Sequence, residues 1–547
     1  MLGLQIDDKD LDLGDDFSFT MNLKNPMFNE LGGYTYPFKI PNTPKNSSIL
    51  GFRHRVQSTI NVYGSNPGMF LWNGHPLFCG KLQMKILNNK SLEGSLIESN
   101  SDFYFQAKNL NLEQIDFGED IFATEVDAMW FLTYSRDHLY PEYKFACPTL
   151  QNDLWFDPPT TDPDLQYYND YHGGGRLWTL TTGGHRTLIM PMLYLRYVFA
   201  KIASQLGFEL IDELFTSHPD LAKLVLYNSV SCNFSAYPTL DIKHLQYNYH
   251  VPRLLLMDFI TAIEKYFCAV TLIDGIKHKM RILPIKKIIL DHTYIDFSRN
   301  ILSISTELEE QINGFNLKMD LDGDDPKLII KDLEEDLAKI DKGSVKTKYD
   351  LPPWPMAQIL DQYYVENENR FYEMYIDKTW IVVISPNIMT SQFYFRDPKE
   401  AIESKLSTLY YNAMCPTLEP PHLGSITCGN KRDDWANIVP RILFALKTNA
   451  YAGMGTFTNA ANETDNFSLF FPGEKGLYNT FWKEYLKFKI STKLVKIEKL
   501  MDFTELQSFD FSRKYMINGI KYLVKDIQVV LKKNTILPAI LSCYPCP

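Results

Sequence analysis

Short runs of alternating apolar and polar residues are the feature that most constrains this fold. Residues 17–23 read FSFTMNL, and residues 2–6 alternate in the same way. A period of two is typical of a strand with one buried face. Residues 70–80, around Asn73–Gly74, and residues 81–97 have the pattern of antiparallel hairpins. Residues 1–115 are therefore predicted to form an N-terminal β-barrel-like domain.

Residues 34–46, YTYPFKIPNTPKN, interrupt this pattern with three prolines. Proline cannot donate a backbone hydrogen bond, so the segment is predicted to be an edge strand or an extended arm. We expect the arm to lie on a neighbouring subunit, bound by edge addition and aromatic anchoring. We also expect a chain without it to fold but not to assemble. The residues assigned to this arm are Tyr34, Tyr36, Pro37, Phe38, Ile40, Pro41 and Pro44.

Four further segments follow, and a helix followed by a strand is predicted in two of them. Residues 191–207 and 254–267 have helical spacing, and an extended stretch follows each. The predicted segments are 116–250, an irregular insertion with a helix–strand unit; 251–350, a helix plus β-hairpins that form the first part of a second β domain; 351–475, a mixed insertion; and 476–547, a helix and a C-terminal hairpin, turning at Asn518–Gly519, that complete the second β domain.

Together these patterns predict a β-rich α+β fold. It would contain antiparallel β-barrel-like domains, an N-terminal barrel and a second barrel closed by the C-terminal strands, with α/β insertions between them. The aromatic content of 14% agrees with this, because flat rings pack well on pleated surfaces.

The net charge and the N-terminal residues disfavour two classes of protein, free nucleic-acid readers and membrane-spanning proteins. A net charge of −11 disfavours a free nucleic-acid reader, which normally has a basic face. An acidic surface suits a duct through which DNA passes without specific binding. The chain begins MLGLQIDDKD and has no apolar run of about 18 residues. We therefore expect no membrane span and synthesis in a cytosol, with the eight cysteines reduced.

Several short motifs resemble known sites, and each also has an ordinary structural interpretation. Residues 320–325 resemble a calcium loop, but the glycine falls fourth, which favours a polar turn. Residues 172–175 resemble a lipase oxyanion loop, yet no nucleophile elbow accompanies them. Cys543 and Cys546 have zinc-knuckle spacing at the chain end. We interpret them as a loose C-terminal tail, with a half-site completed by another subunit as the alternative.

The other candidate residues are equally unspecific. His244 and His250 are six positions apart, a spacing that neither a helix nor a strand makes cofacial. Four tryptophans could be sugar platforms, but interface or core anchors are the commoner use: Trp72, Trp155, Trp178 and Trp354. A sequence cannot place a glycosidase pair of carboxylates. We therefore predict no catalytic, cofactor-binding or metal-binding residues, and a protein that is not an enzyme.

Two regions of the sequence resemble a family of viral proteins. The first is residues 11–52, with the strand at 11–26 and the YTYPFKIPNTPKN arm; the second is residues 477–486 (LYNTFWKEYL) with 516–525 (MINGIKYLVK). Both are similar to the ends of large structural proteins of Bacteroidota phages and prophages. They also resemble tail-hub proteins of contractile phages such as Mu.

This resemblance implies a structural subunit of the virion. Members of the family have β-barrel domains that associate around the tail axis, often as a trimer that imitates sixfold symmetry. Such a hub, also called the baseplate hub, joins the tail tube to a spike or fibres and has no active site. We therefore expect a homo-oligomer, a trimer or a ring of another order, with tube, spike, fibre or adaptor proteins as partners. The alternatives are a tail adaptor or fibre-attachment ring protein, a tail-borne glycan or cell-wall hydrolase, and a soluble carbohydrate-binding protein.

Overall fold

The computed structural model describes most of both ends of the chain and a large part of its centre. The described residues are 1–28, 34–52, 66–87, 90–98, 103, 106–107, 109–148, 150–151, 167–169, 171–172, 176–177, 181–182, 185–186, 189–227, 230–232, 242–275, 277–307, 316–319, 362–365, 370–373, 391–392, 402–404, 407–408, 441–447, 456–457 and 477–546.

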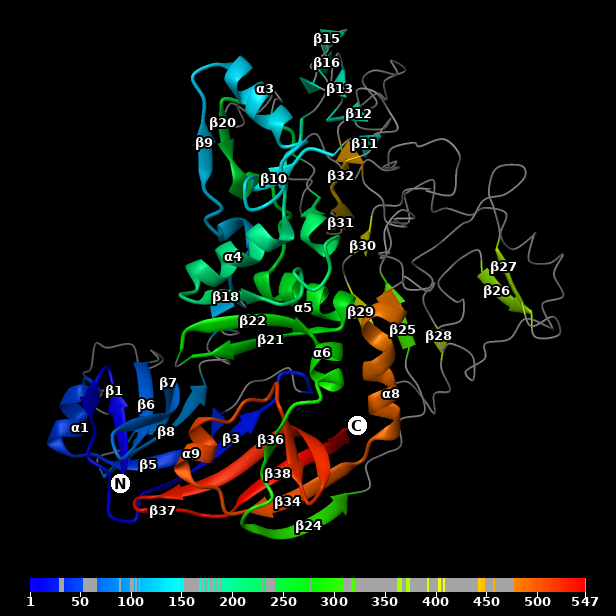
Figure 1. Ribbon diagram of the computed structural model, residues 1–547. Helices are drawn as coiled ribbons and strands as arrows, with labels where there is room; N and C mark the ends of the chain where they lie inside the picture. The colour runs from blue at the N-terminus through cyan, green and yellow to red at the C-terminus, as the bar shows by residue number, and fades with distance from the viewer. Residues whose placement is uncertain are drawn as a thin grey trace.

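One fifteen-stranded sheet joins the two ends of the chain (Figure 1). Its main path has the order β2–β1–β6–β7–β8–β4–β3–β36–β38–β34–β24. The strands are β1 Leu2–Ile6, β2 Lys9–Asp10, β3 Ser18–Lys24, β4 Tyr34–Thr35, β5 Phe38–Pro41, β6 Asn66–Trp72, β7 His75–Leu87, β8 Ser91–Glu98, β23 Tyr294–Asp296, β24 Ile301–Glu307, β34 Leu494–Lys499, β35 Lys514–Ile517, β36 Ile520–Lys532, β37 Thr535–Ile536 and β38 Ala539–Cys546.

The pairing of β3 with β36 holds the two ends together. The two strands run antiparallel, from Ser18 opposite Lys532 to Lys24 opposite Asp526. The hairpins predicted at Asn73–Gly74 and Asn518–Gly519 are confirmed, because all four residues have the positive φ that tight hairpin turns need.

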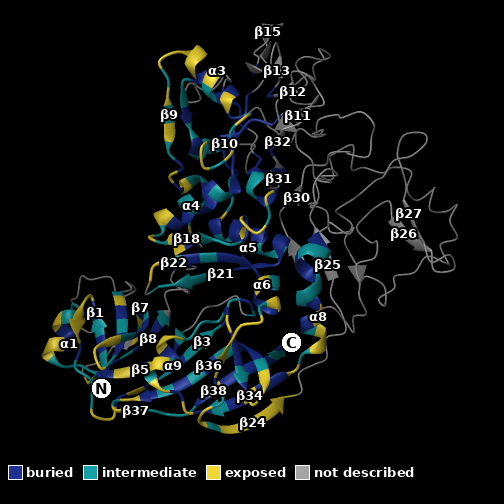
Figure 2. Cartoon of the chain, in the orientation of Figure 1, coloured by how far each residue is buried: buried dark blue, intermediate teal, exposed yellow. Residues whose placement is uncertain are grey.

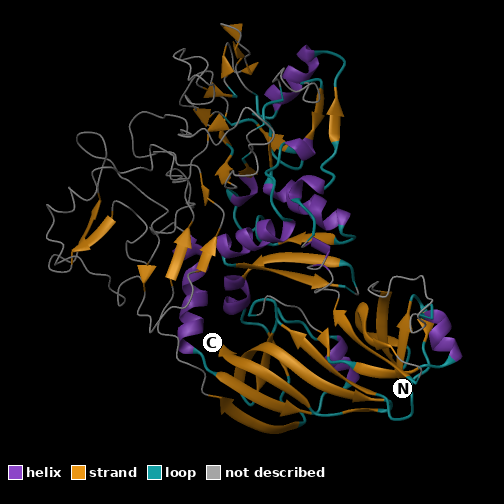
Figure 3. Cartoon of the chain, turned by 180° about the vertical axis from the view of Figure 1, so that it is seen from behind, coloured by secondary structure: helices purple, strands orange, loops and turns teal. Residues whose placement is uncertain are grey.

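The predicted β-rich α+β class is confirmed, but the described strands form no closed barrel. The N-terminal and C-terminal strands form one sheet, where two separate barrels were expected. At the C-terminal part of the sheet, β23 pairs with β35 on one side and β24 pairs with β34 on the other. Residues 297–300 connect these two edge strands, so the chain passes from one edge to the other. Figure 3 shows the strands of the large sheet in the lower part of the view, with most of the helices above them.

One hydrophobic core lies on the inner face of this sheet and takes residues from both ends of the chain. Phe19 stacks on Phe70, with ring centroids 3.7 Å apart and an interplanar angle of 7°. Met21, Ile497 and Leu541 are fully buried in the same core. Figure 2 shows the buried residues running through the sheet, whereas β24 is largely exposed.

An α/β unit lies above the sheet in Figure 1. It confirms the repeated helix–strand order, because strands from both copies share a small sheet with the order β18–β22–β21. The first helix begins at Leu195 and not near 191, since residues 192–193 form a strand that pairs with residues 145–146. The elements of this unit are α4 Leu195–Gln205, β18 Glu209–Asp212, α5 Leu256–Phe267, β21 Ala269–Asp274, β22 Lys279–Pro284 and α6 Ile285–Leu290.

A helical segment lies against this unit, where Trp482 Nε1 donates a hydrogen bond to the Tyr266 carbonyl at 3.4 Å, and it precedes β34. It consists of a π-helical turn and α8, and it confirms the helix predicted near residue 477. No described helix is both long and apolar enough to cross a bilayer. The remaining helical elements are α1 Pro44–Ile49, η1 Leu112–Gln114, α3 Glu125–Tyr134, η3 Leu221–Lys223, η4 Tyr247–Tyr249, η7 Tyr478–Trp482, α8 Lys483–Ser491 and α9 Phe503–Gln507.

The remaining strands are short. They are β9 Glu119–Ile121, β10 Phe145–Ala146, β11 Leu150–Gln151, β12 Tyr167–Tyr168, β13 Tyr171–His172, β14 Arg176–Leu177, β15 Thr181–Thr182, β16 His185–Arg186, β17 Met192–Leu193, β19 Leu224–Leu226, β20 His244–Gln246, β25 Asn316–Met319, β26 Gln362–Val365, β27 Arg370–Glu373, β28 Ser391–Gln392, β29 Ile402–Ser404, β30 Ser407–Thr408, β31 Arg441–Phe444, β32 Leu446–Lys447 and β33 Thr456–Phe457.

Candidate assembly surfaces

The proline-rich segment forms part of the chain's own sheet. Residues Tyr34–Thr35 lie between β3 and β8, and Phe38–Pro41 pair with β8 from Phe38 opposite Gly94 to Pro41 opposite Ser91. Pro44 opens helix α1, where the Thr43 side chain accepts a hydrogen bond from the backbone N–H of Asn46. β5 has no second strand partner among the described residues, which agrees with the predicted edge position.

Burial of this segment corrects the expectation of a free and dispensable arm. Phe38 and Ile40 are 3% and 2% exposed, and both belong to the shared core. The Phe38 ring packs edge-on against Phe70, at a centroid distance of 5.2 Å. Removing residues 34–46 would therefore open the core. Contact between this segment and a neighbouring subunit stays a prediction, and Tyr36, which is 41% exposed, is its most available aromatic ring.

A groove of about 590 Å³ runs beside β5. It is lined by residues 14–18 before and within β3, by residues 37–41, and by Ser91 and Glu93 of β8. Its rim is mainly acidic, and Lys39 forms an ion pair with Glu93 at 3.7 Å. Three of the predicted arm residues, Phe38, Ile40 and Pro41, thus form a wall of this groove through β5.

The β1–β2 turn at one end of the sheet and the chain that follows it to β3 are strongly acidic. Residues 7–16 contain six aspartates and one lysine, a net charge of −5. Asp7 and Asp8 form the turn between β1 and β2, and both are exposed. Asp12 accepts a hydrogen bond from the Thr43 hydroxyl and contacts Lys45 at 3.2 Å, and both contacts lower the pKa of its carboxyl. Asp15 contacts Lys533 at 2.7 Å, which lowers the pKa of the Asp15 carboxyl.

At the opposite end of the sheet, β34 and the helix α8 that precedes it are basic. Residues 483–499 contain six lysines and two glutamates, a net charge of +4. Lys487 pairs with Glu484 at 3.3 Å and Lys496 with Glu307 at 2.6 Å. These charge clusters were visible in the sequence. Their position at opposite ends of one sheet was not, because it depends on pairing between residues about 500 positions apart.

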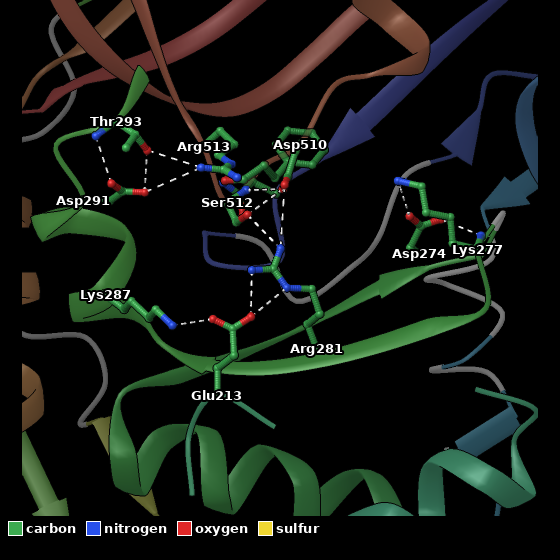
Figure 4. A network of polar contacts seen from close by, with 12 residues as sticks. Glu213, Asp274, Lys277, Arg281, Lys287, Asp291, Thr293, Asp510, Ser512 and Arg513 are labelled. Carbon is green, nitrogen blue, oxygen red and sulfur yellow. Dashed lines mark hydrogen bonds and ion pairs between the residues drawn. The ribbon is translucent and has the colours of Figure 1, made fainter. Parts of the chain in front are cut away.

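A polar joint connects the α/β unit to the sheet (Figure 4). Arg281 of β22 donates to Glu213 through Nε and Nη2, at 3.0 and 2.9 Å, and to the Ser512 hydroxyl at 3.1 Å. Burial raises the pKa of Glu213, but Lys287 and Arg281 outweigh it and hold the pKa below its usual value. Asp510 lies 3.7 Å from Arg281. These contacts hold the α/β unit against the sheet, and we interpret them as structural.

The predicted loose C-terminal tail is wrong. Cys543 and Cys546 lie in β38, where Cys543 is opposite Val495 and Val524 and fully buried. Residues three apart in a strand point to opposite faces, so the two thiols do not converge on one ion. Burial raises the pKa of the Cys543 thiol well above its usual value, which makes it an inert core thiol.

The other candidate motifs form no common site where they are described. His244 contacts Glu119 at 2.7 Å, and buried His250 contacts the Val230 carbonyl at 3.2 Å. No group of three metal-ligating side chains occurs among the described residues. Trp72 is part of β6. Outside the described residues lie the calcium-like loop 320–325, the glycines 173–175, and Trp155, Trp178 and Trp354.

Comparisons with known proteins found similarity at the level of structure alone. No model of a protein family matches the chain, and no curated protein sequence matches it. A 43 kDa tail protein of prophage MuSo2 from Shewanella oneidensis aligns with a TM-score of 0.35 and 6% identity, over 99% of this chain and 96% of that one. A tail protein from Neisseria meningitidis MC58 aligns with a TM-score of 0.29 and 8% identity, over 99% and 95%. Similarity at this level does not assign a function.

Proposed function

We propose that this chain is a non-enzymatic structural subunit of a bacteriophage tail. It acts as a hub that oligomerises around the tail axis and connects the tail tube to a spike or to fibres. A trimer is the favoured order, and a ring of another order serves the same purpose. DNA passes through the assembly without specific binding, and the protein resides in the virion after synthesis in the host cytoplasm.

One observation carries this proposal. The two regions that resemble phage tail proteins lie near opposite ends of the sequence, yet they are partners in space. The first contains β3, which pairs with residues 526–532 of β36, directly after the second region. Within the second region, the Val524 and Lys525 carbonyls accept hydrogen bonds from the Asn25 side chain and backbone N–H, at 2.8 and 2.9 Å. Both regions also contribute to one core. Two separate resemblances thus belong to a single structural unit, and this supports the assignment of that unit to tail assembly.

The chemistry of the described residues fits a protein that binds other proteins. Many described titratable side chains pair in structural contacts, such as Arg281 with Glu213, and the exposed surface carries charged ends and an exposed edge strand. Such features suit contact with copies and neighbours around an axis.

Deletion of the coding sequence from the phage or prophage tests the proposal. We expect particles that lack tails or whose tubes lack a tip, and full-length chain supplied in trans should restore infective particles. Morphologically normal, infective tails without the protein would overturn the proposal. A second arm incubates the purified protein with host cell-wall and capsule extracts, where release of soluble fragments would instead favour a tail-borne hydrolase.

A further inference from the structure

We propose that the acidic end of the sheet in one copy binds the basic end of the sheet in the next copy. The acidic end is defined by residues 7–16, and the basic end by residues 483–499 together with β24. The inference rests on the proposed function, since it names the contact through which a hub would oligomerise.

The acidic end has carboxylates without a cationic partner among the described residues. Asp8 and Asp16 are exposed and have no such partner, and Asp10 accepts a hydrogen bond only from the neutral side chain of Gln5, at 2.9 Å. Lys45 and Lys533 neutralise Asp12 and Asp15, as described above. The uncompensated charge therefore concentrates in the β1–β2 turn and at the start of β3.

The basic end has the complementary excess. Lys493 is exposed, directly precedes β34, and has no acidic partner within the described part of the chain. Lys487 and Lys496 have one carboxylate each, and both lysine side chains are about half exposed, at 60% and 45%. Exposed charges of this kind attract an opposite surface at distances up to about 10 Å at moderate salt.

β24 adds an uncovered apolar edge to the basic end. Ile304 lies opposite Ile497, which is fully buried, so Ile304 continues the inner row of the core. It is nevertheless 44% exposed, and Leu302 is 51% exposed. The strand has a neighbour on one side only among the described residues, and its single charge, Glu307, already pairs with Lys496. An edge strand without proline or lysine usually needs a cover.

A second copy of the chain is the occupant that fits both ends. The two ends are different surfaces at opposite ends of one sheet, so contact between them is head-to-tail and closes into a ring when the rotation allows. The acidic end has a net charge of −5, and the basic end has six lysines and three glutamates once Glu307 of β24 is counted, a net charge of +3, so the two ends are opposite in sign. The same contact would cover Leu302 and Ile304.

Matched charge reversals test this contact in the full-length protein. At the acidic end, D7N/D8N/D10K/D16K leaves two aspartates against three lysines, changing the segment from −5 to +1. Asparagine is used at positions 7 and 8 because both residues have a positive φ, of 49° and 59°, which asparagine tolerates and lysine does not.

At the basic end, K487E/K493E/K496E changes the segment from +4 to −2, a shift of the same size. A control variant, K201E/K277E/K286E, changes the net charge equally but on the α/β unit. Circular dichroism confirms that each variant is folded.

Sedimentation velocity at low salt measures the outcome. We expect the wild type to associate, each end variant to associate on the order of tenfold more weakly, and the control to behave as the wild type. Two results discriminate further. A chain with both sets of substitutions should associate again, and an equimolar mixture of the two end variants should form mixed complexes.

Three results would overturn the inference. They are a wild type that stays monomeric at every concentration tested, end variants that associate as the wild type does, and a doubly reversed chain that remains monomeric. In any of these cases a tail that lacks its tip without this protein would still support the proposed function, and the partner of both ends would then be a different tail protein.

Discussion

Substitution of Lys499 tests most directly how the connection between the edge strands β23 and β24 is attached to the sheet. Its side chain is fully buried, and its ammonium group lies 3.0 Å from the Glu505 carboxylate, 2.5 Å from the Arg299 carbonyl and 4.8 Å from the centre of the Phe297 ring. Arg299 belongs to the connection between β23 and β24. This ammonium group therefore ties that connection to β34 and to helix α9.

The two partners of this ion pair should respond unequally to substitution. Glu505→Gln keeps the shape and the capping contact with the backbone N–H of Asp502, but it leaves a buried ammonium without a counter-charge. Breaking such a pair from one side costs about 3 kcal/mol, the lower part of the usual range, since Glu505 is itself 22% exposed. Lys499→Met leaves the Glu505 carboxylate, which is partly exposed to water, and the Arg299 carbonyl without their partner. We expect this to lower the free energy of unfolding by about 1 kcal/mol.

The hydrogen-exchange rates of the β24 and β34 backbone amides measure the local loss of stability in both variants. We expect exchange to be about 150-fold faster in the Glu505→Gln variant and about fivefold faster in Lys499→Met. The double variant should match Lys499→Met, because the charge on Glu505 matters little once the ammonium is gone. Exchange that is faster in Lys499→Met than in Glu505→Gln would refute this reasoning.

Three further predictions concern the core, the response to pH and the sheet backbone. Phe19→Ala removes a ring stacked on Phe70 and should lower the free energy of unfolding by about 3–5 kcal/mol in urea titrations; a loss under about 1 kcal/mol would contradict the shared core. Burial lowers the pKa of His250 from 6.5 to about 4, so the unfolded chain alone takes up a proton between these values. Stability should therefore fall by up to about 3 kcal/mol as pH drops from 6.5 to 4, and the His250→Asn variant should lose this dependence in urea midpoints measured across that range. Gly94→Ala should lower the melting temperature more than Gly68→Ala, because a Cβ at Gly94 meets a backbone oxygen at 2.8 Å whereas at Gly68 it meets movable methyl groups; equal losses would show that the β7–β8 backbone yields.

Local patterns in the sequence predicted much of the local structure. The alternation at 17–23 and the turns at Asn73–Gly74 and Asn518–Gly519 predicted the right strands and hairpins, because those signals depend on neighbouring residues. The segment around Phe38 was misread, since proline marks an edge but does not show whether the residues beside it are buried.

The long-range arrangement could not be read in this way. The pairing of Thr20 with Val530 joins residues about 500 positions apart, and no periodicity within either strand specifies the other. The same limit explains the error at Cys543, whose strand is central only because β34 and β36 flank it. The candidate surfaces depend on this pairing, so their charges were visible in the sequence but their placement was not.

A reconstruction of the intact phage tail by electron cryomicroscopy tests the central claim most directly. We predict repeated copies of the fifteen-stranded sheet around the axis at the tail tip, with β3 and β36 paired within each copy and β24 facing the β1–β2 turn of the next. A tail tip without this chain, or a single copy away from the axis, would contradict the account.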